Sequence, residues 1–181
     1  MEEKTLSEGV FANGCFWCTE AVFASLKGVR SVTPGYTGGT VQDPTYEQVS
    51  GGNTGHAESL KIKYDPEIIS YDDLLAVFFN THDPTTLNRQ GNDVGTQYRS
   101  AIFYTNDDQK RKSESLIGEL NATKAYDKPI VTEVKPLGEF YEAEDYHKDY
   151  YDNHKDAPYC QLMIAPKLEK LQKRFGELLK N

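Results

Sequence analysis

The sequence predicts an α/β or α+β protein in which helices pack on one β-sheet. Short apolar strands alternate with amphipathic helical segments along the whole chain, which is typical of these classes. No repeat, low-complexity segment or Pro/Gly/Ser-rich linker divides the 181 residues, so we expect a single domain over residues 1–181. The composition, 38% hydrophobic and 27% charged, is that of a globular chain able to bury a core.

Glycines and capping residues mark the element boundaries in the first half of the chain. Gly28 is expected to cap the helix that begins at Cys15. Asp43 and Gly51 are expected to bound a single helical turn, and Ser70 to be the N-cap of an apolar-periodic run. The expected elements are, in order, a strand at 9–13, a helix at 15–27, a strand at 29–39, a helical turn at 43–51, a strand at 56–66 and a helix at 70–82.

The second half of the chain predicts a long polar loop followed by strands and helices. Asn106 and Gln109 have the spacing of a capping box at the start of one helix. The expected elements are a loop at 83–100, a strand at 100–105, a helix at 106–121, a strand at 129–137 and helices at 142–154 and 165–180. An apolar stripe predicts that the last helix packs on the core; its members are Leu168, Leu171, Phe175 and Leu178.

Charge and hydropathy exclude several classes of function. The net charge is −8 and no basic block is present, so we expect no binding to nucleic acid or to anionic membranes. The longest apolar runs, such as 74–79, are too short to cross a bilayer. The first nine residues are acidic and polar, so we expect no secretory signal peptide. Three cysteines are too few for a disulfide scaffold, which favours a reducing, cytoplasmic compartment.

Residues 14–18, GCFWC, carry the strongest chemical signal. Cys15 follows Gly14 at a predicted strand-to-helix turn, where the helix N-terminus stabilises a thiolate, the reactive form of a cysteine. The alternative is a small buried residue at a tight turn. A structural zinc site needs four ligands, and no second cysteine pair accompanies Cys18, so we expect no metal. A general thiol–disulfide oxidoreductase using Cys15 and Cys18 remains an open alternative.

Glu58 is the candidate acid. It shares one face of the predicted strand with Leu60, Ile62 and Tyr64, so it is expected to point inward. An inward carboxyl group tends to stay protonated and can donate a hydrogen bond or a proton. The alternative is that Glu58 lies at the strand edge and reaches solvent or a base. The preceding glycine-rich residues 51–55 favour the first interpretation, because glycine lets the backbone pass close to a site.

The loop at 89–100 is long, polar and punctuated by glycine, as functional loops often are. Tyr98 in this loop and Tyr46 are candidate hydrogen-bond donors. The alternative is plain packing, because the chain holds twelve tyrosines.

Four segments, GCFWCTE, PTYEQVSGGNTGHAE, HDPTTLNRQGNDVGTQYRS and YCQLMIAPK, closely resemble peptide methionine sulfoxide reductase A, in the same order from about Gly9 to Lys167. The resemblance implies a two-layer α/β sandwich with a mixed, ferredoxin-like sheet. It also implies reduction of the S epimer of methionine sulfoxide, free or in proteins, without metal or organic cofactor. A third class, a non-enzymatic module that binds methionine-containing peptides, stays open beside the two enzymatic ones.

The resemblance also implies roles for single residues. Cys15 corresponds to the nucleophile, which becomes a sulfenic acid. The other matched positions are Glu58 as the acid, Tyr46 and Tyr98 as phenols near the sulfoxide oxygen, Asp93 as the loop aspartate, and Phe16 and Trp17 as the wall that holds the substrate's methyl group.

A second thiol is expected to condense with the sulfenic acid, and thioredoxin, or dithiothreitol in vitro, to reduce the resulting disulfide. Cys160 aligns with the family's C-terminal resolving position and follows a proline-containing segment expected to be mobile. Cys18 is the other candidate, although a disulfide within one helical turn of Cys15 is strained. We favour Cys160 and expect the protein to act as a monomer.

Overall fold

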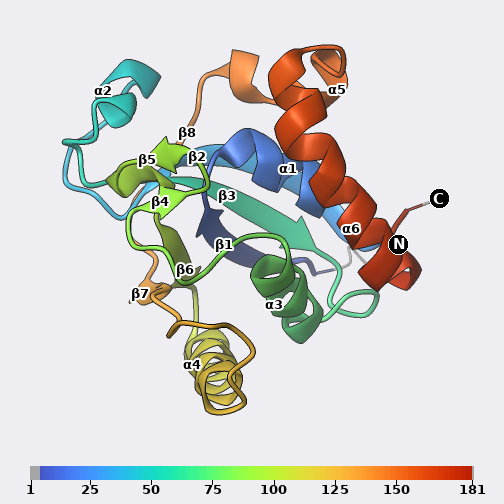
Figure 1. Ribbon diagram of the computed structural model, residues 1–181. Coiled ribbons are helices and arrows are strands. Elements are labelled where there is room, and N and C mark those ends of the chain that lie inside the picture. The colour runs from blue at the N-terminus through green and yellow to red at the C-terminus, as the bar shows by residue number, and fades with distance from the viewer. Residues whose placement is uncertain (1–4, 181) are drawn as a thin grey trace.

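A six-stranded mixed sheet forms the centre of the computed structural model, which describes residues 5–180; residues 1–4 of the polar N-terminal segment and Asn181 lie outside the description (Figure 1). The strand order is β7-β6-β1-β3-β2-β8, and only the β6–β7 pair is parallel. The strands are β1 (Ser7–Asn13), β2 (Val29–Thr37), β3 (Ala57–Tyr64), β6 (Ser100–Tyr104), β7 (Glu133–Pro136) and β8 (Phe140–Glu142).

The helices are α1 (Phe16–Ala24), α2 (Tyr46–Ser50), α3 (Tyr71–Asn80), α4 (Asp107–Ala122), α5 (Tyr150–Asn153) and α6 (Ala165–Phe175). The ring of Phe11 in β1 lies 5.4 Å from Phe23 of α1 and 5.4 Å from Phe78 of α3, so both helices cover the same face of the sheet. The opposite face carries a smaller apolar cluster around Val10 and Phe103. This two-layer arrangement confirms the predicted fold class.

The register of β3 decides which way its side chains point. Phe11 pairs with Leu60, and Glu58 pairs with Tyr36 of β2. Because side chains alternate along a strand, Glu58, Leu60 and Ile62 all lie on the face covered by helices, as the alternation predicts.

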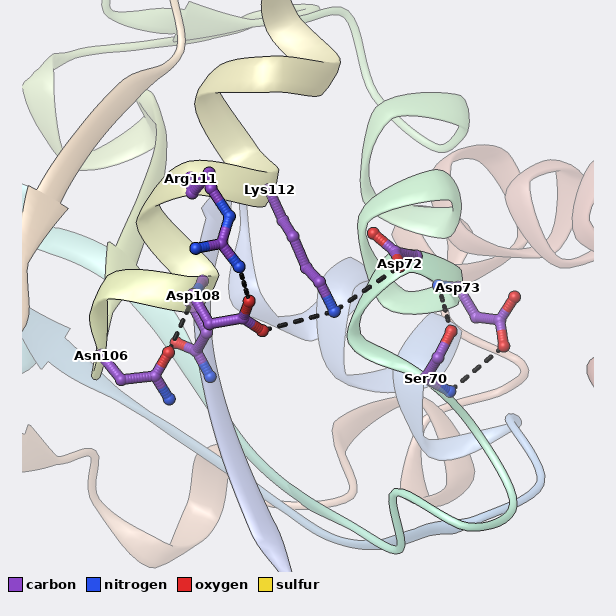
Figure 2. A network of polar contacts seen from close by, with 8 residues as sticks. Ser70, Asp72, Asp73, Asn106, Asp108, Arg111 and Lys112 are labelled. Carbon is purple, nitrogen blue, oxygen red and sulfur yellow. Dashed lines mark hydrogen bonds and ion pairs between the residues drawn. The ribbon is translucent and has the colours of Figure 1, made fainter.

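Side-chain caps start two of the helices where the sequence predicts. The Ser70 hydroxyl accepts a hydrogen bond from the Asp73 N–H at 3.0 Å, and the Asp73 carboxylate accepts one from the Ser70 N–H (Figure 2). The Asn106 side chain accepts from the Gln109 N–H at 2.9 Å, but the Gln109 side-chain oxygen Oε1 accepts from the Thr105 N–H rather than from the Asn106 N–H. The predicted capping box is therefore complete at Ser70 and only half formed at Asn106.

One lysine joins α3 to α4 beside these caps. Lys112 Nζ lies 3.6 Å from Asp72 and 3.3 Å from Asp108, so it bridges the first turns of the two helices (Figure 2). Both acidic residues also lie at helix N-termini, where negative charge is favourable.

Two predicted caps are wrong. Thr45, not Asp43, is the N-cap of α2. Its hydroxyl accepts from the Gln48 N–H, and the Gln48 side-chain oxygen accepts from the Thr45 N–H. Helix α1 ends at Ala24 with Ser25 as its C-cap, before Gly28 is reached. Gly28, at φ +86°, instead turns the chain into β2.

The segments at 83–100 and 142–154 differ most from expectation. The first is not a structureless loop: it contains the hairpin β4 (Arg89–Gln90) and β5 (Asp93–Val94) and a 3₁₀ turn at Thr96–Tyr98. The second is not one helix but β8, a 3₁₀ turn at Asp145–His147 and the short α5. Pairing of β8 with β2 holds the latter segment against the sheet edge, and this tertiary contact overrides its helical pattern.

The residues that follow α6 are hydrogen-bonded to the residues that follow α1. The Lys27 N–H donates to the Leu178 carbonyl at 2.6 Å and the Lys180 N–H donates to the Ser25 carbonyl at 2.8 Å. The helix ends at Phe175, earlier than predicted, but its apolar stripe packs on the core as predicted; the stripe is Leu168, Leu171, Phe175 and Leu178. Within residues 5–180, no helix is long and apolar enough to cross a membrane.

Candidate active site

Gly14 forms the tight turn that delivers Cys15 to the start of α1. Its φ is +102°, and an added Cβ would lie 2.9 Å from the side chain of Gln90 in the hairpin. Only glycine fits this close approach without strain. Cys15 is the N-cap residue of α1, is half-buried, and its carbonyl accepts from the Cys18 N–H at 3.1 Å. The sequence-predicted position at a helix start is therefore confirmed.

Cys15 and Cys18 form a coupled thiol pair. A hydrogen bond from the Cys15 thiol lowers the pKa of Cys18 to about 7. The same hydrogen bond, together with burial, raises the pKa of Cys15 well above its usual value. The Tyr159 hydroxyl lies 3.7 Å from Cys18 Sγ and also stabilises negative charge on this sulfur. The hydrogen bond between the two thiols therefore favours negative charge on Cys18 over Cys15, and the Cys15 thiolate stays a prediction.

Cys160 belongs to the same cluster of side chains. It is fully buried and packs with Cys15 and Cys18. Burial and the negative charge on Cys18 raise the pKa of the Cys160 thiol. Cys160 opens a π-helical turn, Cys160–Ile164, that continues into α6. The three thiols thus belong to one cluster of side chains, and Cys160 sits in helical backbone. The mobility expected of the proline-containing segment before it stays a prediction.

Glu58 lies directly below the first turn of α1. It is 1% exposed, and its Oε1 accepts a hydrogen bond from the Phe16 N–H at 3.2 Å. Its Oε2 is buried with no hydrogen-bond partner among residues 5–180. Burial is the main cause that raises the pKa of Glu58 to about 8, and the nearby Asp93 adds to it. The carboxyl group is therefore protonated at neutral pH and has one oxygen without a protein partner.

Tyr98 lies at the site because hydrogen bonds hold its loop, residues 89–100, against the segment before β3. The Arg99 guanidinium donates to the Gly55 carbonyl at 2.9 Å, and the Thr96 hydroxyl donates to the Gly52 carbonyl at 3.2 Å. Burial, and after it the charge of Glu58, raise the pKa of both Tyr98 and Tyr46. Both phenols therefore keep their O–H donors at any pH near neutral.

Asp93 projects from β5 of the same hairpin. Burial raises the pKa of Asp93, while the positive charge of Lys167 lowers it. The charge of Asp93 also acts on Glu58, Tyr46 and Tyr98, so the loop aspartate stands within electrostatic reach of the acid and both phenols.

Phe16 and Trp17 form an aromatic wall beside the thiols. Phe16 is buried and its ring centroid lies 6.5 Å from Tyr46. Trp17 is half-buried and stacks on Tyr150 of α5, with centroids 3.9 Å apart and planes inclined by 8°. Every residue that the sequence predicts for the site therefore lies around the start of α1.

Sequence reasoning missed the residues that support this wall. Tyr36, His147, Tyr150 and Tyr159 contact the predicted site residues through rings or hydroxyl groups. Glu144 stands behind them and contacts Tyr36 and His147. A signal is present in the aromatic-rich run 144–151, EDYHKDYY, which lies in the helix predicted at 142–154, and in Tyr159, which directly precedes Cys160. A cavity of about 710 Å³ near His82, Tyr126 and Lys167 contains none of the predicted site residues.

The arrangement suits a ligand with an accepting oxygen next to a small apolar group. Neutral donors from a carboxyl group and two phenols can bind the oxygen, an aromatic wall can bind the apolar group, and a thiol stands between them. A two-layer α/β fold with this site defines a thiol-dependent oxidoreductase.

The sequence profile of the peptide methionine sulfoxide reductase family matches residues 7–179. The chain is 58% identical over 180 residues to the peptide methionine sulfoxide reductase MsrA of Saccharolobus solfataricus, covering 99% of this chain and 98% of the relative. It is 51% identical over 173 residues to MsrA of Deinococcus radiodurans, covering 96% and 84%.

Solved structures agree with the sequence comparison. Mxr1 from Saccharomyces cerevisiae in reduced form has a TM-score of 0.77 at 32% identity, covering 86% of this chain and 89% of that one. Methionine sulfoxide reductase A of Corynebacterium diphtheriae has a TM-score of 0.75 at 33% identity, covering 85% and 77%. The chain belongs to the peptide methionine sulfoxide reductase A family and is a peptide-methionine (S)-S-oxide reductase. Family membership decides against both a general thiol–disulfide oxidoreductase and a non-enzymatic binding module.

Proposed function

We propose that Cys15 reduces the S epimer of methionine sulfoxide, free or in oxidised proteins, at the start of α1. The observation that carries this assignment is the buried, protonated Glu58 whose Oε2 has no partner in the described chain, directly below the helix turn that holds Cys15. A buried acid of this kind is suited to bind and protonate a sulfoxide oxygen. Tyr46 and Tyr98 supply two further O–H donors to that oxygen.

The reductive step transfers the sulfoxide oxygen to the thiol. The Cys15 sulfur attacks the sulfoxide sulfur while Glu58 donates a proton to the departing oxygen. Methionine leaves, and Cys15 carries the oxygen as a sulfenic acid, so the sulfoxide is reduced by two electrons and the thiol is oxidised by two. Phe16 and Trp17 hold the methyl group and so aim the substrate sulfur at Cys15.

Cys18 accepts the Cys15 proton at the moment of attack. The hydrogen bond between the two sulfurs and the lowered pKa of Cys18 both support this role. The Cys18 thiol then returns the proton to Glu58 through solvent after methionine has left.

Cys160 then attacks the Cys15 sulfenic acid, releasing water and forming a disulfide. Its burial in the same cluster as Cys15 supports the proposal, whereas Cys18 lies in the first turn of α1, where a disulfide to Cys15 distorts the helix. We further propose that thioredoxin reduces this disulfide. Mxr1, which shares the fold of this chain, has been solved in complex with Trx2.

The remaining assignments concern the setting of the reaction. We propose one catalytic domain over the whole chain, acting as a monomer in the cytoplasm on oxidised proteins or free methionine sulfoxide, with no resident metal or organic cofactor. Electrons enter from thioredoxin, and dithiothreitol replaces it in vitro.

The test follows the two epimers of a methionine sulfoxide derivative separately, with dithiothreitol as reductant. We expect loss of the S epimer only, and no loss with Cys15→Ser. Equal loss of both epimers, or activity retained without Cys15, contradicts the proposal.

A further inference from the structure

His147 is a buried histidine that the proposed mechanism does not use. Its side chain is 0% exposed, although it lies in a surface segment between β8 and α5. Its ring centroid lies 4.4 Å from Tyr46, 5.0 Å from Phe16 and 5.7 Å from Trp17. The imidazole therefore stands directly behind the aromatic wall of the active site.

The hydrogen bond from Trp17 defines the tautomer of His147. Its Nδ1 accepts from the Trp17 indole N–H at 3.0 Å, so Nδ1 carries no proton. Burial lowers the pKa of His147, which favours the neutral ring. The single ring proton is then on Nε2, which forms no hydrogen bond with residues 5–180 but lies 3.3 Å from a Glu144 carboxylate oxygen, whose negative charge favours a proton there.

Glu144 is held in turn by two phenols. The Tyr36 hydroxyl donates to its carboxylate at 3.3 Å, and the Tyr146 hydroxyl donates at 3.2 Å. Tyr36 lies in β2 opposite Glu58. A continuous chain of polar contacts thus runs from the sheet through Glu144 and His147 to the indole of Trp17.

These contacts restrict the rotation of the Trp17 indole. Tyr150 stacks on the face of the Trp17 ring, and His147 binds its N–H, so one contact fixes the plane and the other fixes the rotation within that plane. An indole N–H buried without an acceptor costs free energy, so the ring turns to find another partner when the acceptor is lost.

We propose that His147 is a positioning residue that holds Trp17 in the orientation that receives the substrate's methyl group, with Glu144 fixing the tautomer of His147. The inference rests on the proposed role of Trp17 as the substrate wall. Glu144 and His147 act through Trp17 and do not touch the reacting atoms.

The single tryptophan of the chain makes the test direct, because all tryptophan emission comes from Trp17. His147→Leu removes the acceptor, whereas His147→Asn keeps a carbonyl oxygen near the position of Nδ1. We expect His147→Leu to shift the emission spectrum, lower its anisotropy and raise KM by about tenfold with little change in kcat, the pattern of lost ground-state and transition-state binding alike. His147→Asn should restore most of the wild-type KM and spectrum.

His82 provides the matched control. Its imidazole is half-buried and is hydrogen-bonded at both nitrogens, to the Phe78 carbonyl and the Ser100 hydroxyl, and the rings that it contacts are those of Phe78 and Phe79. His82→Leu should lower thermal stability and leave both Trp17 emission and KM unchanged. A folded His147→Leu with wild-type emission and KM overturns the inference, as does an equal effect of His82→Leu on both.

Two further measurements keep the test decisive. If His147→Leu does not fold, nitrogen NMR of the wild-type imidazole reads the tautomer, and a proton on Nδ1 at neutral pH overturns the inference. Trp17→Phe tests the underlying assignment separately: an unchanged KM in this variant removes Trp17 from substrate binding, whereas the emission of the His147 variants still reports whether His147 positions the indole.

Discussion

The backbone N–H of Phe16 donates a hydrogen bond to Oε1 of Glu58, 42 residues further along the chain. This bond ties the acid in the sheet to the first turn of the helix that begins at Cys15. The hydrogen bond joins the proposed proton donor to the residue that follows the proposed nucleophile, so a change at Glu58 is expected to alter chemistry more than binding.

Glu58→Gln should slow the reductive step by about 10²-fold or more, the usual scale for a lost general acid. The loss should shrink at low pH, where solvent protons replace the missing donor. Single-turnover rates between pH 5 and 9 measure both effects. Glu20→Gln is the matched control, since Glu20 is also buried but bonds the Tyr150 N–H, and it should react nearly as fast as wild type. A wild-type rate for Glu58→Gln across neutral pH removes Glu58 from the mechanism.

Glu58 should also make stability depend on pH. Its pKa is about 8 in the folded protein and near 4.5 when unfolded, so the folded state binds more protons between these values. The free energy of unfolding contributed by this group therefore falls as the pH rises from about 4.5 to about 8. Urea unfolding at pH 5 and pH 8.5 should show Glu58→Gln gaining stability relative to wild type at the higher pH. An equal difference at both values contradicts the raised pKa.

Cys18→Ser should move the titration of Cys15. Without the neighbouring thiol, the pKa of Cys15 should fall, because the hydrogen bond and the negative charge of Cys18 that raise it are both lost. The rate of Cys15 alkylation at neutral pH should rise, and its pH profile should shift downward. An unchanged alkylation profile means that Cys18 does not control the titration of Cys15.

Cys160→Ser should complete one turnover and then stop. We expect one equivalent of methionine, a persistent sulfenic acid on Cys15 and no cycling with thioredoxin. Mass spectrometry after reaction with substrate alone identifies the oxidised residues. A dominant Cys15–Cys18 disulfide in the wild-type enzyme, with Cys160 still free to alkylate, shows that Cys18 is the resolving thiol.

Gly14→Ala should destabilise the fold by about 1–3 kcal/mol, the scale for a residue held in an unfavourable backbone conformation. The added methyl group also meets the Gln90 side chain, so the hairpin that carries Asp93 should shift and activity should fall with stability. Gly138→Ala is the control, because a Cβ there meets nothing within 4 Å. Equal stabilities of the two variants contradict the strain at Gly14.

The sequence predicts those features that depend on local pattern. Alternation placed Glu58 on the apolar face, the glycine before Cys15 placed the thiol at a helix start, and Ser70 marked a helix N-terminus. Each of these rests on contacts within a few residues. The apolar stripe of α6 belongs to the same group, since its period alone selects the face that packs.

Long-range contacts explain what the sequence did not predict. The sequence places His147 within a predicted helix at 142–154. In the structure, β8 pairs with β2, and the ring of His147 lies behind Trp17. The raised pKa of Cys15 follows first from the hydrogen bond to Cys18, and a helix-start argument for one thiol omits the second. Thr45 displaces Asp43 as a cap because Gln48 completes a capping box with Thr45.

The segments on both sides of α6 are held near α1. Cys160, in the turn before α6, packs beside Cys18 of α1, and Leu179, after α6, bridges to Leu26, which follows α1. The segment cannot swing as a free arm, so travel of Cys160 toward Cys15 must come from within the segment itself. The π-helical turn at Cys160–Ile164 offers that length, because such a turn holds one residue more than an α-helical turn. We therefore expect oxidation to change the helical pitch of the turn Cys160–Ile164, while the C-terminal end of α6 keeps its position.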